Sequence, residues 1–463
     1  MSTASVAKRI AVGATGLILA AAAVGAAVAP WPTIAGDGVA EQQPAGPRHT
    51  LTPLPAETVL ACDGPMLALG RDASDAAGLS VAAEVDLVSA SADADGPDTE
   101  GRIDLPDVGS SFLVRQAPDG ESPVPVAASV SADIDAEDMS GLVASACAPG
   151  QPESWIVGAR VATGVTDILI VQNPSDVPAT VEVEVFGVDG AATPSAGSMA
   201  IPARSQRAVP VASLAGGETD PVLRVTSEGA PVRASLQSSS IATLEPNGAD
   251  LQSASLPAHE HVMPRVSITA PPEESAAATT VLRLLGTGPD AAQVTVDVVS
   301  LKTGESELTA DVDIMDRKPA TVDLSDLDPG RYTLRMRSDA PFVAAALQTR
   351  GSDYGWVVPS EPFDEPALVA VPGSASSYTL TLANTSDEPV EVAVSRQDGD
   401  DEPTTVEVAP GASEQMPAES GQTLRIAPDG PIAASIARVS SGSVATLPVV
   451  PDPATPEEIT VAP

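Results

Sequence analysis

The chain has 463 residues, of which 63 are Asp or Glu and 23 are Lys or Arg, so its formal net charge is −40 at pH 7. A surface this acidic repels nucleic acid and anionic lipid, because binding either of them requires a basic footprint. Aromatic residues make up only 2% of a chain that is 43% hydrophobic, so its cores must be largely aliphatic. The 36 Gly and 45 Pro are spread along the sequence, which is typical of short strands joined by turns.

The first 32 residues contain a candidate membrane segment. Lys8 and Arg9 precede an uncharged run of 20 residues, 10–29. A helix of that length spans roughly 30 Å, the thickness of a bilayer core, and the positive flank favours a cytoplasmic amino terminus. We therefore expect a cytoplasmic stub and a transmembrane signal anchor over residues 1–32. The bulk of the chain would then be extracytoplasmic at the cell membrane.

A cleaved signal peptide is the alternative for the same segment. Ala27-Val28-Ala29 has the small-x-small form of a cleavage site, although Pro30 would follow the cut, and a cut after Ala27 is a second option. Both interpretations export everything after residue 32. A Pro-rich linker is expected over residues 33–57.

Two cysteines, Cys62 and Cys147, lie 85 residues apart. An exported chain enters an oxidising compartment in which two thiols can pair. A disulfide closing a loop of this length stabilises the folded segment by about 4–5 kcal/mol in the chain-entropy model. We predict the disulfide Cys62–Cys147; two unrelated buried thiols are the alternative.

A strand-turn-strand phrase recurs four times in the chain. It reads VLRVTSEGAPVRASLQ from Val222, TLRMRSDAPFVAAALQ from Thr333 and TLRIAPDGPIAASIAR from Thr423, with a looser version from Phe112. Each copy is an apolar strand with an arginine, an acidic or glycine turn, a proline and a second apolar strand. We expect the proline at the start of the module's final strand, where the sheet does not need a hydrogen bond from the backbone N–H that proline lacks. The prolines are Pro125, Pro231, Pro341 and Pro431.

A second phrase opens three of these repeats, beginning at Asp167, Thr280 and Tyr378. Each is a strand, a turn of Asn, Thr, Pro or Asp, and then a strict alternation such as Val-Glu-Val-Glu-Val over residues 181–185. Alternation with a period of two places the valines on one face of a sheet and the carboxylates on the other. The first repeat has a weaker counterpart over residues 79–88.

Short strands that recur in this way, without amphipathic helices, are the pattern of an immunoglobulin-like sandwich. We therefore predict an all-β fold of four tandem immunoglobulin-like modules followed by a disordered tail over residues 451–463. The alternative is a closed, propeller-like arrangement in which each repeat is one blade. The four modules are predicted at residues 58–150, 151–258, 259–357 and 358–450.

Five short motifs stand out in these modules. They read WIVG at residues 155–158, NPSD at 173–176, GAPV at 229–232, CDGP at 62–65 and AC at 146–147. The motifs resemble an actinobacterial family of exported or membrane-anchored proteins that carry a domain of unknown function. The likeness covers most of the chain after residue 55. It implies an actinobacterial cell envelope and brings no enzymatic activity or ligand with it.

Candidate metal ligands are few. His259 and His261 would share one face of a strand and could hold a transition metal with a third ligand, but a solvated linker between modules explains them as well. The acidic runs from Asp398 to Glu402 and from Asp93 to Gly96 could bind calcium through oxygens. Neither run has the spacing of a calcium loop, and acidic residues are common turn formers. We therefore predict no metal site.

Catalytic motifs are not visible in the sequence. None of the three histidines lies in the context of a hydrolytic triad, and the glycine-rich loops that bind phosphate are missing. A glycosidase would need aromatic platforms beside its carboxylates, and this chain is poor in aromatics. Trp155 and Trp356 each precede the opening strand of a module, and we interpret them as core or inter-module plugs. We predict no enzyme and no cofactor.

These observations favour a non-catalytic, membrane-anchored structural or protein-interaction protein of the cell envelope. Its partners would be the membrane, through the N-terminal helix, and other envelope proteins that contact exposed strand edges. Nucleic acid is excluded by the charge. The alternative is a module that binds envelope polysaccharide or binds a ligand in a calcium-dependent way.

Overall fold

The computed structural model describes residues 49–51, 55–71, 75, 77–93, 96–106, 108–120, 122–194, 196–270, 280–315, 317–397, 399, 402–451 and 459–461. The expected membrane segment over residues 1–32 and most of the expected linker and tail lie outside these residues. Among the residues described, no helix is long and apolar enough to cross a membrane. The described residues divide into two units, a small one of residues 49–51 with 459–461 and a larger one that lies between residues 55 and 451.

The smaller unit contains one antiparallel pair, β1 (His49–Leu51) with β34 (Ile459–Val461). The larger unit is built from strands β2 to β33, and its one helical element within the described ranges is the 3-10 turn η1 (Val211–Ser213). The prediction of an all-β fold is therefore confirmed. The predicted module ranges are kept below as names for parts of this unit.

The second module consists of two sheets. One has β16 at its centre between β10 and β12, with β13 and β14 on the far side of β12; the other has the order β18-β17-β11-β15. The strands are β10 (Glu153–Ile156), β11 (Val165–Asn173), β12 (Ala179–Gly187), β13 (Gly190–Ala192), β14 (Ser198–Ile201), β15 (Ser205–Pro210), β16 (Val222–Glu228), β17 (Arg233–Ala242) and β18 (Glu245–Ser253).

The same pairing order recurs in the fourth module, as β26-β31-β28-β29 and β33-β32-β27-β30. Both modules also contain the same asparagine-centred turn. In each, the Asn side chain accepts from the serine two residues on and donates to backbone carbonyls, as Asn173 does in β11 and Asn384 does in β27. The strands are β26 (Ala367–Ala370), β27 (Ser377–Asn384), β28 (Val390–Arg396), β29 (Thr404–Val408), β30 (Ser413–Glu419), β31 (Thr423–Pro428), β32 (Ile432–Val439) and β33 (Val444–Pro448).

The third module follows the same order with one difference. Its strand β24 (Gly330–Arg350) is 21 residues long, so its first half pairs with β19 and β21 and its second half with β20 and β25. One continuous strand thus replaces the two strands found in the neighbouring modules. The other strands are β19 (Ala258–Ile268), β20 (Thr280–Gly286), β21 (Ala292–Ser300), β22 (Ser306–Ile314), β23 (Ala320–Asp323) and β25 (Asp353–Val357).

The first module is joined to the second through a shared sheet. Strand β6 pairs in parallel with β15 at Asp104 and Ser205, which gives the seven-stranded order β18-β17-β11-β15-β6-β7-β2. Its other strands form a hairpin, β3 with β4, and a sheet of order β5-β8-β9. The strands are β2 (Thr58–Ala61), β3 (Met66–Leu69), β4 (Leu79–Ala83), β5 (Asp86–Ser91), β6 (Asp98–Leu105), β7 (Gly109–Gln116), β8 (Val126–Asp135) and β9 (Ser140–Ala146).

The repeated phrases occupy equivalent places. Pro125, Pro231 and Pro431 come just before β8, β17 and β32, whereas Pro341 lies inside β24. The prediction that these prolines open the final strand of each module was wrong, because one more antiparallel strand follows in every case. A period of two readily predicts a strand but gives no count of the strands that come after it.

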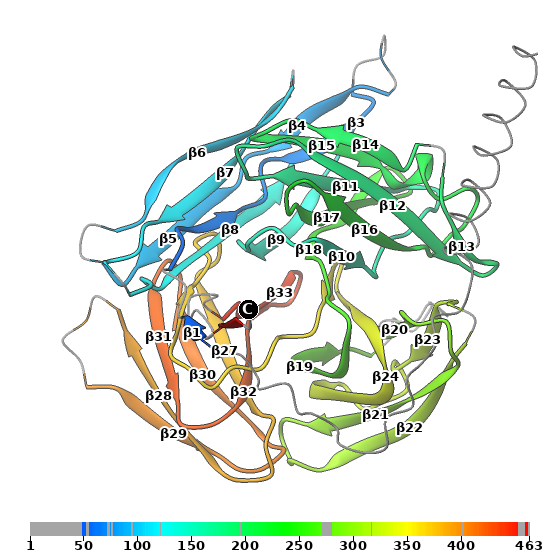
Figure 1. The fold of residues 1–463 in the computed structure, drawn as a ribbon. Helices are drawn as coiled ribbons and strands as arrows, with labels where there is room; N and C mark the ends of the chain where they lie inside the picture. Colours follow the sequence, from blue (N-terminus) through cyan, green and yellow to red (C-terminus); the bar gives the residue numbers. More distant parts are fainter. Residues whose placement is uncertain are drawn as a thin grey trace, which may run out of the picture. The chain divides into compact units, whose positions relative to one another are not determined.

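The additional strands, β9, β18, β25 and β33, are called the inner strands here. Each is hydrogen-bonded along one edge to its own module, and its other edge faces the inner strands of neighbouring modules. Three of them are labelled in the middle of the larger unit in Figure 1. Leu142, Ala144 and Ala146 of β9 also belong to the hydrophobic core of the fourth module. The first and last modules of the unit therefore pack against each other.

Candidate functional site

The two histidines do not form a joint site. A β-bulge at the start of β19 changes the register between Ala258 and Glu260. As a result His259 is exposed, while His261 is buried with its Nε2 2.7 Å from the carbonyl oxygen of Phe342. Burial lowers the pKa of His261. Within the described ranges, no three His, Cys, Asp or Glu side chains are placed to hold a metal ion.

The acidic runs are described only in part. Asp93 follows β5, and its carbonyl accepts the backbone N–H of Gly96 in a turn. Glu402 is exposed. Asp95, Asp398, Asp400 and Asp401 lie outside the described residues.

Both tryptophans are buried between modules, as interpreted from the sequence. Trp155 and Trp356 belong to one apolar cluster whose members come from the second and third modules, together with Val358 at the start of the fourth. The ring centroids of Trp155 and Phe186 are 5.1 Å apart. Gly158 lies so close to Trp356 that a Cβ at this position would be 2.4 Å from the indole ring. These rings fill a junction and present no face to a ligand.

The disulfide Cys62–Cys147 is present in the structure. It joins the ends of β2 and β9, and the residues beside it form the first of two buried polar clusters. Asp63 is 0% exposed and binds Arg233 of β17 through two N–H···O contacts of 2.8 and 2.7 Å. Ser145 and Ser235 also donate to this carboxylate. Despite full burial, the pKa of Asp63 is lowered, because the charge and the hydrogen bonds of Arg233 outweigh the desolvation.

The second polar cluster centres on Asp353, the first residue of β25. Its carboxylate accepts backbone N–H groups from three other inner strands, at 3.2 Å from Leu142 of β9, 3.3 Å from Ala249 of β18 and 3.0 Å from Val444 of β33. One side chain therefore binds the inner strand of every other module. Gly141 permits this approach, since a Cβ there would lie 2.6 Å from Asp353 Oδ1.

Further ionisable groups surround this carboxylate. Asp250 of β18 accepts the N–H of Trp356 at 2.8 Å, and burial raises its pKa to about 8. Burial likewise raises the pKa of Asp353 to about 6. Nearby, Asp167 accepts from Ser238 and from the backbone of Arg160, and burial raises its pKa to about 6. We call Asp167, Asp250 and Asp353 the carboxylate cluster.

The carboxylate cluster is closed by Arg160 and Tyr354. The guanidinium of Arg160 lies 4.3 Å from the centroid of the Tyr354 ring. The Tyr354 hydroxyl is 2.8 Å from Ser238 Oγ, and burial raises the pKa of the phenol. The carboxylates thus accept hydrogen bonds from backbone N–H and hydroxyl groups of the protein itself. These hydrogen bonds hold neighbouring strands together.

A buried arginine and a half-buried one cross two further junctions between modules. Arg283 of the third module donates to the carbonyls of Val157 and Ala159 and pairs with Asp220 at 2.7 Å, all in the second module. Arg335 of the third module donates to the carbonyl of Asn384 in the fourth. Carbonyls at strand ends gain a charged donor in this way.

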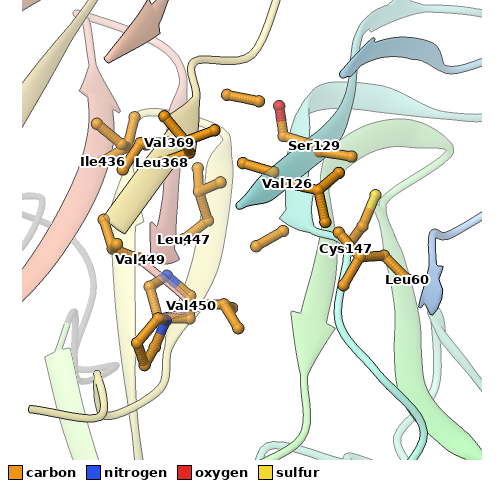
Figure 2. Close-up of a pocket in the computed structure, with 16 residues that line it drawn as sticks. Leu60, Val126, Ser129, Cys147, Leu368, Val369, Ile436, Leu447, Val449 and Val450 are labelled. Atoms are coloured by element: carbon orange, nitrogen blue, oxygen red, sulfur yellow. The ribbon is translucent and has the colours of Figure 1, made fainter. Parts of the chain in front are cut away.

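A small apolar pocket lies where the first and fourth modules meet (Figure 2). Leu60, Val126 and Cys147 line one side, and Leu368, Val369 and Leu447 line the other. Its volume is about 30 Å³, which is room for one or two water molecules, whereas typical ligand pockets measure roughly 300–1,000 Å³.

A model of a family of unknown function, DUF5719, matches residues 88–419, well over half of the chain. The chain belongs to this family. The DUF5719 match contains the whole carboxylate cluster and Arg233, whereas Cys62, Asp63 and the inner strand β33 lie outside it. None of the curated proteins matches the chain.

Sequence reasoning did not find the carboxylate cluster. Asp250 and Asp353 each stand in a short stretch of small and apolar residues, Gly-Ala-Asp-Leu and Asp-Tyr-Gly-Trp-Val. A single acid in such a stretch is the one local signal available. Among 63 acidic residues that signal is weak without knowledge of which strands meet.

Proposed function

We propose that this protein is a non-catalytic structural or interaction protein of an actinobacterial cell envelope, anchored by one N-terminal membrane helix. The observation that carries this proposal is the position of Asp353, which binds the inner strands of the three other modules. Such a contact fixes four modules relative to one another. A rigid frame of this kind is suited to presenting several binding surfaces at set spacings.

We further infer that the four sandwich-like modules form a closed set rather than a linear array. Two observations support this. The fourth module takes core residues from β9 of the first, and the Oγ atoms of Ser131 in β8 and of Ser374 lie 2.8 Å apart. In a linear array the first and fourth modules would have no such contacts.

The outer edges of the sheets are the surfaces that we propose for partner binding. Strands β22 and β29 each end the order of their sheet, so no described strand pairs with the second edge of either. Such an edge can accept a strand from a partner. On β22 the exposed Glu307, Asp311 and Asp313 restrict this pairing, and they favour a partner with basic residues.

The interaction role is tested by site-specific photo-crosslinking in cells that express the full chain. A photoreactive residue is placed at Thr405 on β29 or at Thr309 on β22, both exposed. A matched control carries it at Asp189, in an exposed turn between β12 and β13. We expect one discrete adduct with an envelope protein from an edge position and none from the control. Equal labelling at all three positions would contradict the proposal.

The location is tested separately by adding protease to intact cells from which the outer layers of the envelope have been removed. We expect the part of the chain after the anchor to be digested, and a cytoplasmic marker to stay intact. Protection of the whole chain would place it inside the cell and refute an envelope role. This outcome would leave the contacts of Asp353 unaffected.

A further inference from the structure

Arg265 in β19 is a buried cation without a counter-ion in the part of the chain that the structure describes. The residue is 6% exposed, and its Nε and Nη1 atoms have no hydrogen-bond partner. The two other arginines that are buried to this degree, Arg233 and Arg283, each pair with a carboxylate at 2.7 Å. An unpaired buried charge is costly. Within the described residues, Arg265 lacks the carboxylate partner that Arg233 and Arg283 have.

The charge of Arg265 persists at neutral pH. Burial lowers its pKa to about 10, and the like charge of Arg331 acts in the same direction. A group with this pKa is protonated at pH 7. Arg331 pairs across the strands with Ser267, two residues beyond Arg265. Two guanidinium groups thus produce a locally positive site in a chain of net charge −40.

A β-bulge directs Arg265 away from the core of its own module. The register of β19 against β24 shifts between Met263 and Val266, and both of these flanking residues belong to the core of the third module. The opposite face of β19 is covered by the fourth module. There Val262 packs against Ala383 of β27 and Ala433 of β32.

A second contact fixes the place of Arg265 along this face. The N–H of Ser267 donates to Gln348, whose amide in turn donates to Thr446 of β33. Arg265 lies between these two contacts along β19. Ala383 of β27 pairs with Ala433 of β32. Two residues further along each strand, in the direction of Thr446, Thr381 pairs with Ser435. Counted along the strands in this way, Thr381 and Ser435 are the residues of the fourth module that correspond in position to Arg265.

Two hydroxyl groups on these strands are also unpartnered. Ser267 Oγ and Ser435 Oγ are buried without a hydrogen-bond partner, whereas Thr381, 0% exposed, accepts from the amide of Gln415. A hydroxyl can donate one hydrogen bond. The site thus combines a guanidinium with two free hydroxyls, and a water molecule could satisfy hydrogen bonds there but could not balance the charge.

We propose that Arg265 anchors a binding site for a small inorganic anion, of the size and charge of chloride, at the junction of the third and fourth modules. A halide accepts from several donors at once and leaves a buried cation neutralised. Binding there would hold β19 against β27 and β32.

The test is thermal unfolding of the full chain in detergent, in sodium chloride and in sodium gluconate at equal ionic strength. We expect a saturable rise in Tm with chloride of about 2–4 °C, because a ligand of the native state stabilises it. Arg265→Met should abolish the rise. Arg335→Met is the matched control, since Arg335 spans the same junction through carbonyls, and it should keep the chloride response.

Crystals of the unsubstituted protein soaked in bromide give an independent readout. We expect an anomalous peak beside the Arg265 guanidinium. If Arg265→Met does not fold, Arg265→Lys keeps the charge with fewer donors and should show a weakened chloride response. Equal Tm values in both salts, or a bromide-soaked crystal without a peak at Arg265, would overturn the proposal.

Discussion

Asp250 and Asp353 make the stability of the protein depend on pH at the scale of single residues. Their pKa values in the folded chain, about 8 and about 6, lie above the ordinary value of 3.8. The folded state therefore binds these protons more tightly than the unfolded state does. Their contribution to the free energy of unfolding is complete below about pH 4. It is lost as the pH rises through about 6 for Asp353 and through about 8 for Asp250.

The substitution Asp250→Asn distinguishes the pH dependence that Asp250 causes from the pH dependence that Asp353 causes. The amide oxygen can still accept the N–H of Trp356, and an amide imitates the neutral acid. We expect the unfolding free energy of the unsubstituted protein to fall by about 2 kcal/mol between pH 6 and pH 8. Asp250→Asn should show little of this fall and similar stability at pH 6. Urea unfolding across this pH range is the measurement, and a parallel fall in the variant would refute the assignment.

Arg233 and Asp63 form a buried pair in which each group depends on the other. Arg233→Met leaves the Asp63 carboxylate buried without its cation, which should destabilise the protein by about 3–5 kcal/mol. In the double variant Asp63→Asn, Arg233→Met no buried charge is left, so it should recover a large part of this loss. Chemical denaturation of the single and double variants measures the difference. Two variants of equal stability would show that the ion pair is not the cause.

At the scale of elements, the hairpin between β17 and β18 has an unfavourable turn. Thr243 and Leu244 both have positive φ angles, 50° and 76°, in a position where Asn-Gly is preferred. Leu244 is 91% exposed, so its side chain contributes no packing. Bulky residues with positive φ cost roughly 1–3 kcal/mol each.

The double variant Thr243→Asn, Leu244→Gly should therefore be more stable than the unsubstituted protein by about 1–2 kcal/mol. The matched control is Val188→Gly, an exposed position (75%) with an ordinary φ angle, which should bring no gain. Calorimetry of both variants provides the comparison. A lower Tm for the double variant would mean that the turn is held by contacts that its exposure does not reveal.

The same scale shows how far the sequence could predict the fold. Alternation at Val181, Val183 and Val185 predicted strands whose valines are fully buried, and the phrases from Val222, Thr333 and Thr423 do form equivalent strands. These signals are local. The meeting of β9, β18, β25 and β33 at Asp353 depends on residues up to 302 positions apart (142 to 444), and no local pattern encodes such distances.

At the scale of the whole larger unit, the junctions between modules differ in kind. Arg233, Arg283 and Arg335 each cross one of the three junctions between consecutive modules. The junction of the fourth module with the first is not bridged by an arginine among the described contacts, and it contains the small apolar pocket and a group of serine hydrogen bonds. It is also the junction across which the chain does not continue. We therefore expect it to open before the others.

A crosslink across this junction tests both its geometry and its weakness. Ser131 Oγ accepts the backbone N–H of Gly373 and of Ser374, and the two serine oxygens lie 2.8 Å apart. The double variant Ser131→Cys, Ser374→Cys should therefore oxidise to a disulfide that speeds migration on a non-reducing gel. The control pair Ser131→Cys, Ser198→Cys, with its second cysteine on β14, should not. If this junction opens first, the bond should also raise the Tm under oxidising conditions and lose that effect on reduction. Failure to crosslink would mean that the first and fourth modules are not held together in solution, and a crosslink without a rise in Tm would show that another junction opens first.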